Sequence, residues 1–180
     1  MKKQEIPKRK HPRLKLYDYS QPGGYFITIC TANRKCILSN ISIAPTVPDS
    51  NTVGRGLAPA ETNLSKWGEI VEKELLDLEN AFPFLRLDKY VIMPNHIHAI
   101  LIITAEAAGA SPRPTIMDMI CRFKSITTRK CKLLGFEGIL FQESFYDHII
   151  RNGQDYDEIS KYIEENPLNW YYDELYYNKQ

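Results

Sequence analysis

The chain has 180 residues, a length typical of a single domain, which buries about 70 per cent of its unfolded surface. With 23 Lys and Arg against 22 Asp and Glu, its net charge of +1 gives no argument for a nucleic-acid partner, so any basic surface must be local. The cysteines lack CxxC spacing and the longest apolar run, at 97–103, is too short for a membrane span, which together indicate a cytoplasmic protein with reduced thiols.

Residues 1–15 form a basic N-terminal arm without the apolar core of a secretory signal. Its cations extend to Arg13 and Lys15, which could follow DNA phosphates, although a solvated tail has the same composition. Tyr17 and Tyr19 come directly after the arm, and their rings suit stacking on unpaired bases. The alternative is that both tyrosines pack on the sheet.

The first half of the chain predicts a strand, a loop, a helix and a second strand. Residues 25–31 are apolar and β-branched and follow the turn at 22–24, which predicts a strand covered on both faces. Residues 40–63 are rich in Pro, Gly, Ser and Asn and are interpreted as a variable loop insertion. Apolar residues at helical spacing predict a helix over 64–82, with Ser65 as its N-cap, and residues 87–93 predict the next strand.

The segment Met93-Pro94-Asn95-His96-Ile97-His98 begins an apolar run that predicts a central strand, joined to its predecessor by a tight turn at Pro94-Asn95. Side chains alternate across a strand, so His96 and His98 share one face and Ile97 points into the core. Two imidazoles at this spacing can bind one metal ion, or they can be two polar residues at a strand start. We expect them at the sheet edge, where a substrate can approach.

A loop at 105–114 precedes a helix predicted over 115–134, which Gly135 ends. Cations crowd the second half of this helix, among them Arg122, Lys124 and Arg129. They could form a phosphate-binding face, or they could complement the helix dipole.

Residues 140–151 predict a last strand, on which His148 is a competing metal ligand or a group satisfied by a local hydrogen bond. A final helix is expected after 152–153, with Asp155 as its N-cap. Tyr162 and Asn166 then lie one turn apart on one helix face. The element order, strand, helix, strand, strand, helix, strand, helix, predicts one α+β domain over 1–180. Its fold is a ferredoxin-like (RRM-like) antiparallel sheet with an extra C-terminal helix across the histidines.

Three segments together resemble the HUH single-tyrosine transposases. They are Met-Pro-Asn-His-Ile-His at 93–98, Ser-Phe-Tyr-Asp-His-Ile-Ile-Arg at 144–151 and Tyr-Ile-Glu-Glu-Asn-Pro at 162–167. Within that group the chain is similar to the REP-associated tyrosine transposases, which are insertion-sequence-200-like, and the opening segment at 16–26 matches as well. The resemblance covers most of residues 13–172. Asn166 stands where many relatives carry Gln.

The resemblance implies metal-dependent cleavage of single-stranded or hairpin DNA and strand transfer, in DNA transposition or repeat processing. Tyr162 would be the nucleophile that forms a 5′-phosphotyrosine, and His96, His98 and Asn166 would bind Mg²⁺ or Mn²⁺. The protein would act as a monomer or homodimer. Two other classes stay open: a non-catalytic RRM-like module that uses Tyr25 and Phe26 as stacking rings, and a metal-dependent nuclease in which water attacks.

Overall fold

The computed structural model describes residues 17–43, 60–105, 114–173 and 175–176. Its centre is a four-stranded sheet of order β4-β5-β1-β6, in which every pairing is antiparallel. The strands are β1 (Gly23–Cys30), β4 (Leu85–Ile92), β5 (His96–Ile103) and β6 (Tyr146–Ile150). This is the strand order of the ferredoxin-like fold, so the predicted α+β architecture with an antiparallel sheet is confirmed.

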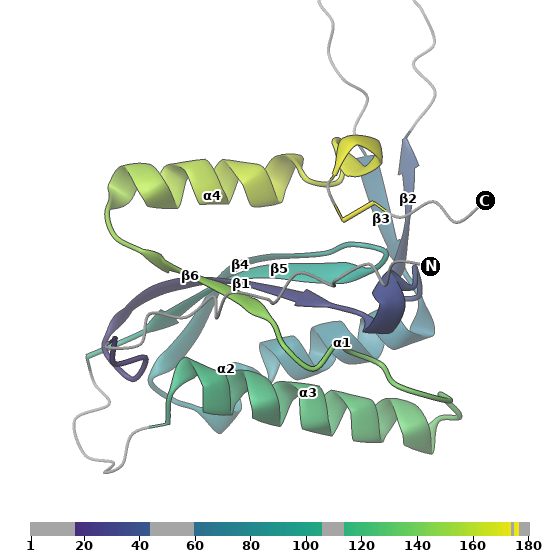
Figure 1. Cartoon of the computed structure of the whole chain (residues 1–180), viewed down its shortest axis with the longest axis horizontal. Coiled ribbons are helices and arrows are strands. Elements are labelled where there is room, and N and C mark those ends of the chain that lie inside the picture. The colour runs from purple at the N-terminus through teal and green to yellow at the C-terminus, as the bar shows by residue number, and fades with distance from the viewer. Residues whose placement is uncertain (1–16, 44–59, 106–113, 174, 177–180) are drawn as a thin grey trace, which may run out of the picture.

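Helices cover both faces of the sheet (Figure 1). On one face lie α1 (Lys66–Leu76), α2 (Leu78–Ala81) and α3 (Ile116–Leu133). On the opposite face lies α4 (Gly153–Glu165), which packs on β4 and β5. Because β5 is central and covered on both sides, all of its residues except Ile102 are buried, which explains the continuous apolar run of residues 99–103. The sheet therefore has two different faces, and the two histidines lie on the one that carries α4.

The helix predicted over 64–82 is two helices, because the α-helical run ends at Leu76 and resumes at Leu78. Ser65 is the N-cap of α1, as predicted, and its hydroxyl oxygen accepts hydrogen bonds from the backbone N–H groups of Trp67 and Gly68. Gly68 also lets α1 approach the preceding segment closely: a Cβ at this position would lie 2.0 Å from the Leu38 carbonyl oxygen.

The interpretation of residues 40–63 as a loop is wrong at both ends of the segment. β2 (Ser39–Ile43) and β3 (Ala60–Leu64) pair as a separate two-stranded antiparallel sheet, and residues 44–59 lie outside the described part. β2 alternates polar and apolar residues only over residues 40–43, and β3 has three polar residues in a row, Glu61, Thr62 and Asn63, so it shows no apolar alternation that would reveal the pair. The Ser39 hydroxyl donates to the Ile92 carbonyl oxygen and so links this hairpin to the end of β4.

Two further boundaries differ from the sequence prediction. The last strand is β6 alone, shorter than the predicted 140–151. Asn152 is the N-cap of α4, where Asp155 was predicted, because the Asn152 side-chain oxygen accepts a hydrogen bond from the Asp155 backbone N–H at 2.9 Å. The Asp155 carboxylate faces β6 instead. Within the described ranges, no helix combines the length and apolar character that crossing a bilayer requires.

Candidate functional site

His96 and His98 begin β5 and lie side by side on the α4 face of the sheet, with ring centroids 4.5 Å apart. Ile97 points the other way into the main core, as the alternation predicts. β5 is a central strand, as predicted. The expectation that the histidines lie where a substrate can approach is contradicted, because the two residues are 0% and 2% exposed and the ring of Trp170 from η2 (Trp170–Tyr172) lies 5.9 Å from that of His96.

Hydrogen bonds to the Nδ1 atoms orient both imidazoles. His96 Nδ1 lies 2.7 Å from the Asn95 side-chain oxygen, and Asn95 Nδ2 donates to the Leu175 carbonyl at 2.8 Å. Since Asn95 turns its oxygen to the ring, His96 carries its proton on Nδ1 and keeps a lone pair on Nε2. His98 Nδ1 pairs with the Thr28 hydroxyl at 2.9 Å. Both rings therefore turn Nε2 away from these partners.

Burial lowers the pKa of His96 to about 3, and it does the same to the pKa of His98, against which the neighbouring imidazole of His96 acts in the same direction. Both side chains are therefore neutral at neutral pH. A neutral imidazole with an unprotonated nitrogen is the form that binds a metal ion.

An acidic residue that the sequence analysis missed completes the cluster. Asp173 follows η2, and its carboxylate lies 3.9 Å from His96 Nε2. Ligand atoms of His96, His98 and Asp173 all lie within 4.8 Å of one another, as a metal-binding group would. The only sequence signal was an Asp directly after the aromatic run 170–172, which has no periodicity that could place it.

Asn166 lies beside the same group, at the C-cap of α4. Its Nδ2 donates to the Asp173 carboxylate at 3.1 Å. Among the described residues, two buried side-chain atoms have no hydrogen-bond partner, and they are His96 Nε2 and Asn166 Oδ1. Buried polar atoms rarely stay unsatisfied, so two in one cluster fit a site built around a cation. The donor set of imidazole nitrogen, carboxylate and amide oxygen suits a divalent ion.

Tyr162 reaches the histidines from α4. Its hydroxyl lies 3.3 Å from His98 Nε2, and its side chain is 44% exposed, so solvent reaches the phenol. The buried Ile163 packs with Phe26 and Ile100 of the sheet and so fixes how α4 is turned. The helix thereby directs Tyr162 and Asn166 to the histidines, and the predicted spacing of one turn accounts for both.

His148 belongs to a different cluster. Its Nε2 pairs with both carboxylate oxygens of Asp155, at 3.0 and 2.9 Å, next to the start of α4. The Asp155 carboxylate also accepts the Arg151 backbone N–H, and the hydrogen bond from His148 is the main cause of its lowered pKa. Of the two interpretations of His148, the structure shows the local hydrogen bond.

The predicted DNA-contacting residues come from the N-terminal segment and from α3, and those that the structure describes lie apart from the histidine cluster. Arg13 and Lys15 lie outside the described residues. Tyr17 and Tyr19 pack against each other and against Tyr25, with Tyr19 buried in the main core. Burial favours the packing alternative for these two rings, and their stacking on bases stays a prediction.

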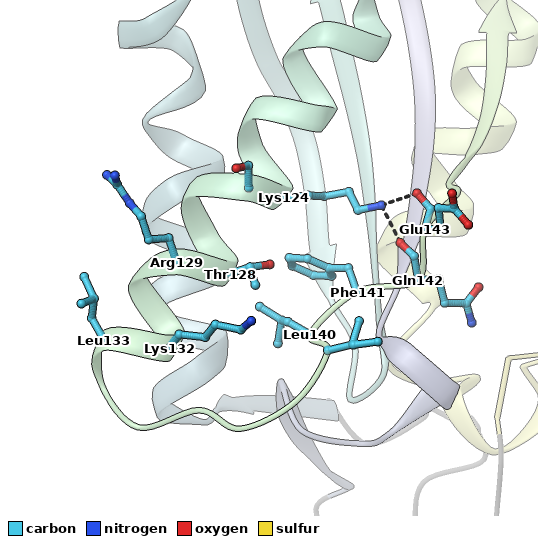
Figure 2. Close-up of a pocket in the computed structure, with 11 residues that line it drawn as sticks. Lys124, Thr128, Arg129, Lys132, Leu133, Leu140, Phe141, Gln142 and Glu143 are labelled. Carbon is cyan, nitrogen blue, oxygen red and sulfur yellow. Dashed lines mark hydrogen bonds between the residues drawn. The ribbon is translucent and has the colours of Figure 1, made fainter.

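Arg122, Lys124 and Arg129 lie on α3, across the sheet from the histidines. Arg122 and Arg129 are exposed, whereas Lys124 donates to the carbonyl oxygens of Gln142 and Glu143 (Figure 2). Lys124, Arg129 and Lys132 line a hollow of about 590 Å³ whose other wall is the segment 139–143. The cations are therefore grouped near the edge of the sheet that β6 forms.

No family model matches this chain, but known proteins resemble it in sequence and in structure. An uncharacterized protein of Haemophilus influenzae is 31% identical over 186 residues, which cover 95% of this chain and 94% of that protein. A solved structure of a REP-associated tyrosine transposase bound to a REP hairpin matches with a TM-score of 0.58 at 18% identity. That match covers 88% of this chain and 74% of the other, and at such identity it establishes a common fold.

Proposed function

This chain belongs to the family of the Haemophilus influenzae protein and has the fold of a REP-associated tyrosine transposase, and from that premise we propose that it cleaves single-stranded DNA and transfers the cut strand. The observation that carries the proposal is the meeting of Tyr162 and His98, at 3.3 Å, inside a buried cluster of metal-binding side chains. The proposed nucleophile and the proposed metal ligands come from three chain segments and lie in one cluster.

The metal ion would be held by His96, His98 and Asp173, with the amide oxygen of Asn166 as a further ligand. The neutral imidazoles and the unpartnered Nε2 and Oδ1 atoms support this assignment. When bound, a divalent ion supplies Lewis-acid polarisation of the phosphodiester. Imidazole nitrogen together with carboxylate favours Mn²⁺ over Mg²⁺, which prefers oxygen ligands and retained water.

Tyr162 would attack the phosphorus. The phenol oxygen forms a bond to phosphorus, the bond to the 3′ oxygen breaks, and the proton that the phenol loses is balanced by the one that the 3′-hydroxyl gains. The product is a 5′-phosphotyrosine, which keeps the phosphodiester energy, so a second 3′-hydroxyl can attack it and rejoin strands. His98 orients the phenol through its hydrogen bond in the metal-free protein.

Hairpin DNA is the substrate class that the comparison suggests, since the solved relative is bound to a REP hairpin. The exposed cations of α3 suit the phosphates of a hairpin stem, and the unpaired strand would then pass to the histidine cluster. As an RRM-like module, by contrast, the chain would need exposed rings on β1. Tyr25 and Phe26 are both buried, and the hydroxyl of Tyr25 donates to the Gln21 carbonyl.

A denaturing gel tests the proposal. Labelled single-stranded DNA with a repeat hairpin is incubated with Mn²⁺ and the full chain, and we expect a covalent protein–DNA band that a chelator abolishes. Tyr162→Phe removes one oxygen and little volume, so it should lose the band and keep DNA binding. Tyr156→Phe is the matched control, because Tyr156 lies on the same helix and bonds Asp88 instead. Cut DNA without a covalent band from the wild type would show that water attacks.

Metal binding is measured separately by calorimetric Mn²⁺ titration. His96→Ala and His98→Ala should each weaken binding and remove cleavage, because each deletes a ligand from the cluster. Unchanged Mn²⁺ affinity in either variant would contradict the metal assignment.

A further inference from the structure

Tyr146 is the first residue of β6 and lies in register with the metal cluster. It stands opposite Thr28 of β1, which in turn stands opposite His98 of β5. Residues directly opposite one another in an antiparallel sheet project to the same face. Neighbouring strands lie about 4.8 Å apart, so the backbones of Tyr146 and His98 are separated by about 10 Å. A nucleotide adjoining the site can therefore reach Tyr146.

The Tyr146 ring contacts an aromatic neighbour and is half-exposed to solvent. It forms a T-shaped pair with Phe26, with ring centroids 6.5 Å apart and an interplanar angle of 71°, and Tyr162 forms another with the same Phe26, at 6.2 Å and 84°. Phe26 is itself buried, whereas Tyr146 is 50% exposed. α4 packs on β4 and β5, which leaves Tyr146 on the outer strand uncovered. A half-exposed ring fixed by an aromatic neighbour is what an unpaired base needs for stacking.

The route from the cations of α3 to the histidines passes this tyrosine. α3 and the histidine cluster lie on opposite faces of the sheet, and β6 is the edge strand between them (Figure 1). Lys124 ties α3 to Gln142 and Glu143, a few residues before β6 (Figure 2). A DNA strand that runs from the α3 cations around this edge reaches the α4 face at Tyr146.

We propose that Tyr146 is a stacking subsite for an unpaired nucleobase beside the phosphodiester that is cut. The subsite rests on the proposed function, because it requires a single DNA strand at the histidine cluster. Its chemistry is that of an aromatic face rather than of a charge, so it adds affinity without sequence readout and without salt dependence. Arg122 and Arg129 would contribute the salt-dependent part.

The test measures binding of a fluorescent single-stranded oligothymidylate with Mn²⁺, for the full chain and its variants. Tyr146→Ala should weaken binding on the order of tenfold with an unchanged salt slope, and Tyr146→Phe should keep the wild-type affinity. Leu76→Ala is the matched control, because Leu76 is equally exposed, at 50%, on the opposite layer, and it should bind as the wild type does. Thermal melts of all variants check that the fold is retained.

Three results would overturn the subsite: wild-type affinity in Tyr146→Ala, equal weakening in Tyr146→Ala and Tyr146→Phe, or a changed salt slope. Photocrosslinking with an iododeoxyuridine oligonucleotide gives a second measurement. We expect the crosslinked peptide to contain Tyr146, and a crosslink found only in other peptides would contradict the subsite. The covalent band of the wild type, run in parallel, separates the two proposals. If the covalent band forms but Tyr146→Ala binds DNA as the wild type does, the subsite alone is refuted. If the band does not form, the proposed function is refuted, and the subsite with it.

Discussion

Acidification of the metal-free protein should destabilise it through the two buried histidines. Burial lowers the pKa of His96 and of His98 to about 3, against an ordinary value near 6.5. Between these pH values the unfolded chain binds a proton at each histidine that the folded chain does not bind. The free energy of unfolding is therefore undiminished above about pH 6.5, falls as the pH drops below that value, and goes on falling to about pH 3.

The size of the effect follows from the same shifts. Each pH unit below 6.5 costs about 1.4 kcal/mol per histidine, so the fall from about pH 7.5 to about pH 5 costs about 2 kcal/mol for each ring. The two rings together would account for about 4 kcal/mol, a large share of the 5–15 kcal/mol typical of a domain.

Urea unfolding in the presence of a chelator, at both pH values, measures this loss. The control is His98→Gln, which removes one titrating ring and should show about half the pH dependence attributed to the pair. Hydrogen bonds from Thr115 lower the carboxyl pKa of Asp118, so this group stays ionised over the measured pH range. Its contribution to the unfolding free energy is the same in the wild type and the variant. Equal pH dependence in wild type and variant would refute the assignment of neutral buried imidazoles.

Three further changes have distinct expected outcomes. The double variant Arg122→Gln, Arg129→Gln should weaken DNA binding about equally for all sequences. The slope of log affinity against log salt concentration should also flatten by about one per lost phosphate contact, as titrations at several salt concentrations would show. An unchanged slope would mean that these cations only complement the helix dipole. Asn166→Ala should lower Mn²⁺ affinity about tenfold, with cleavage partly restored at high Mn²⁺. If calorimetry finds the Mn²⁺ affinity unchanged, Asn166 is not a metal ligand. Ser65→Ala should cost about 1 kcal/mol in urea unfolding through loss of the α1 cap, whereas an unaltered midpoint would exclude that role.

Much of the site could be predicted from local periodicity. Alternation along β5 places His96 and His98 on one face whatever the rest of the chain does, and helical spacing places Tyr162 one turn from Asn166. These relations span a few residues and need no tertiary information. The ferredoxin-like order could likewise be predicted from the sequence of elements, because it depends on their type and not on their exact ends.

The parts that could not be predicted depend on contacts between segments that lie far apart in the sequence. Asp173 reaches His96 only because η2 folds back over β5, and no pattern after Pro167 specifies that turn. The cap of α4 was ambiguous because Asn152 and Asp155 are both good N-cap residues three positions apart. In the structure Asn152 is the N-cap, and the Asp155 carboxylate instead contacts His148 on β6. That contact between two elements cannot be predicted from the local sequence pattern.

The residue that becomes covalently linked to DNA is the most direct measure of the proposed chemistry. Wild-type protein is incubated with hairpin-bearing single-stranded DNA and Mn²⁺, digested with nuclease and protease, and analysed by mass spectrometry. We expect a nucleotide attached through a 5′-phosphate to the peptide that contains Tyr162, whose hydroxyl lies 3.3 Å from His98. A nucleotide on Tyr146 or Tyr156 would contradict the nucleophile assignment, and cleaved DNA with no modified peptide would contradict the covalent mechanism itself.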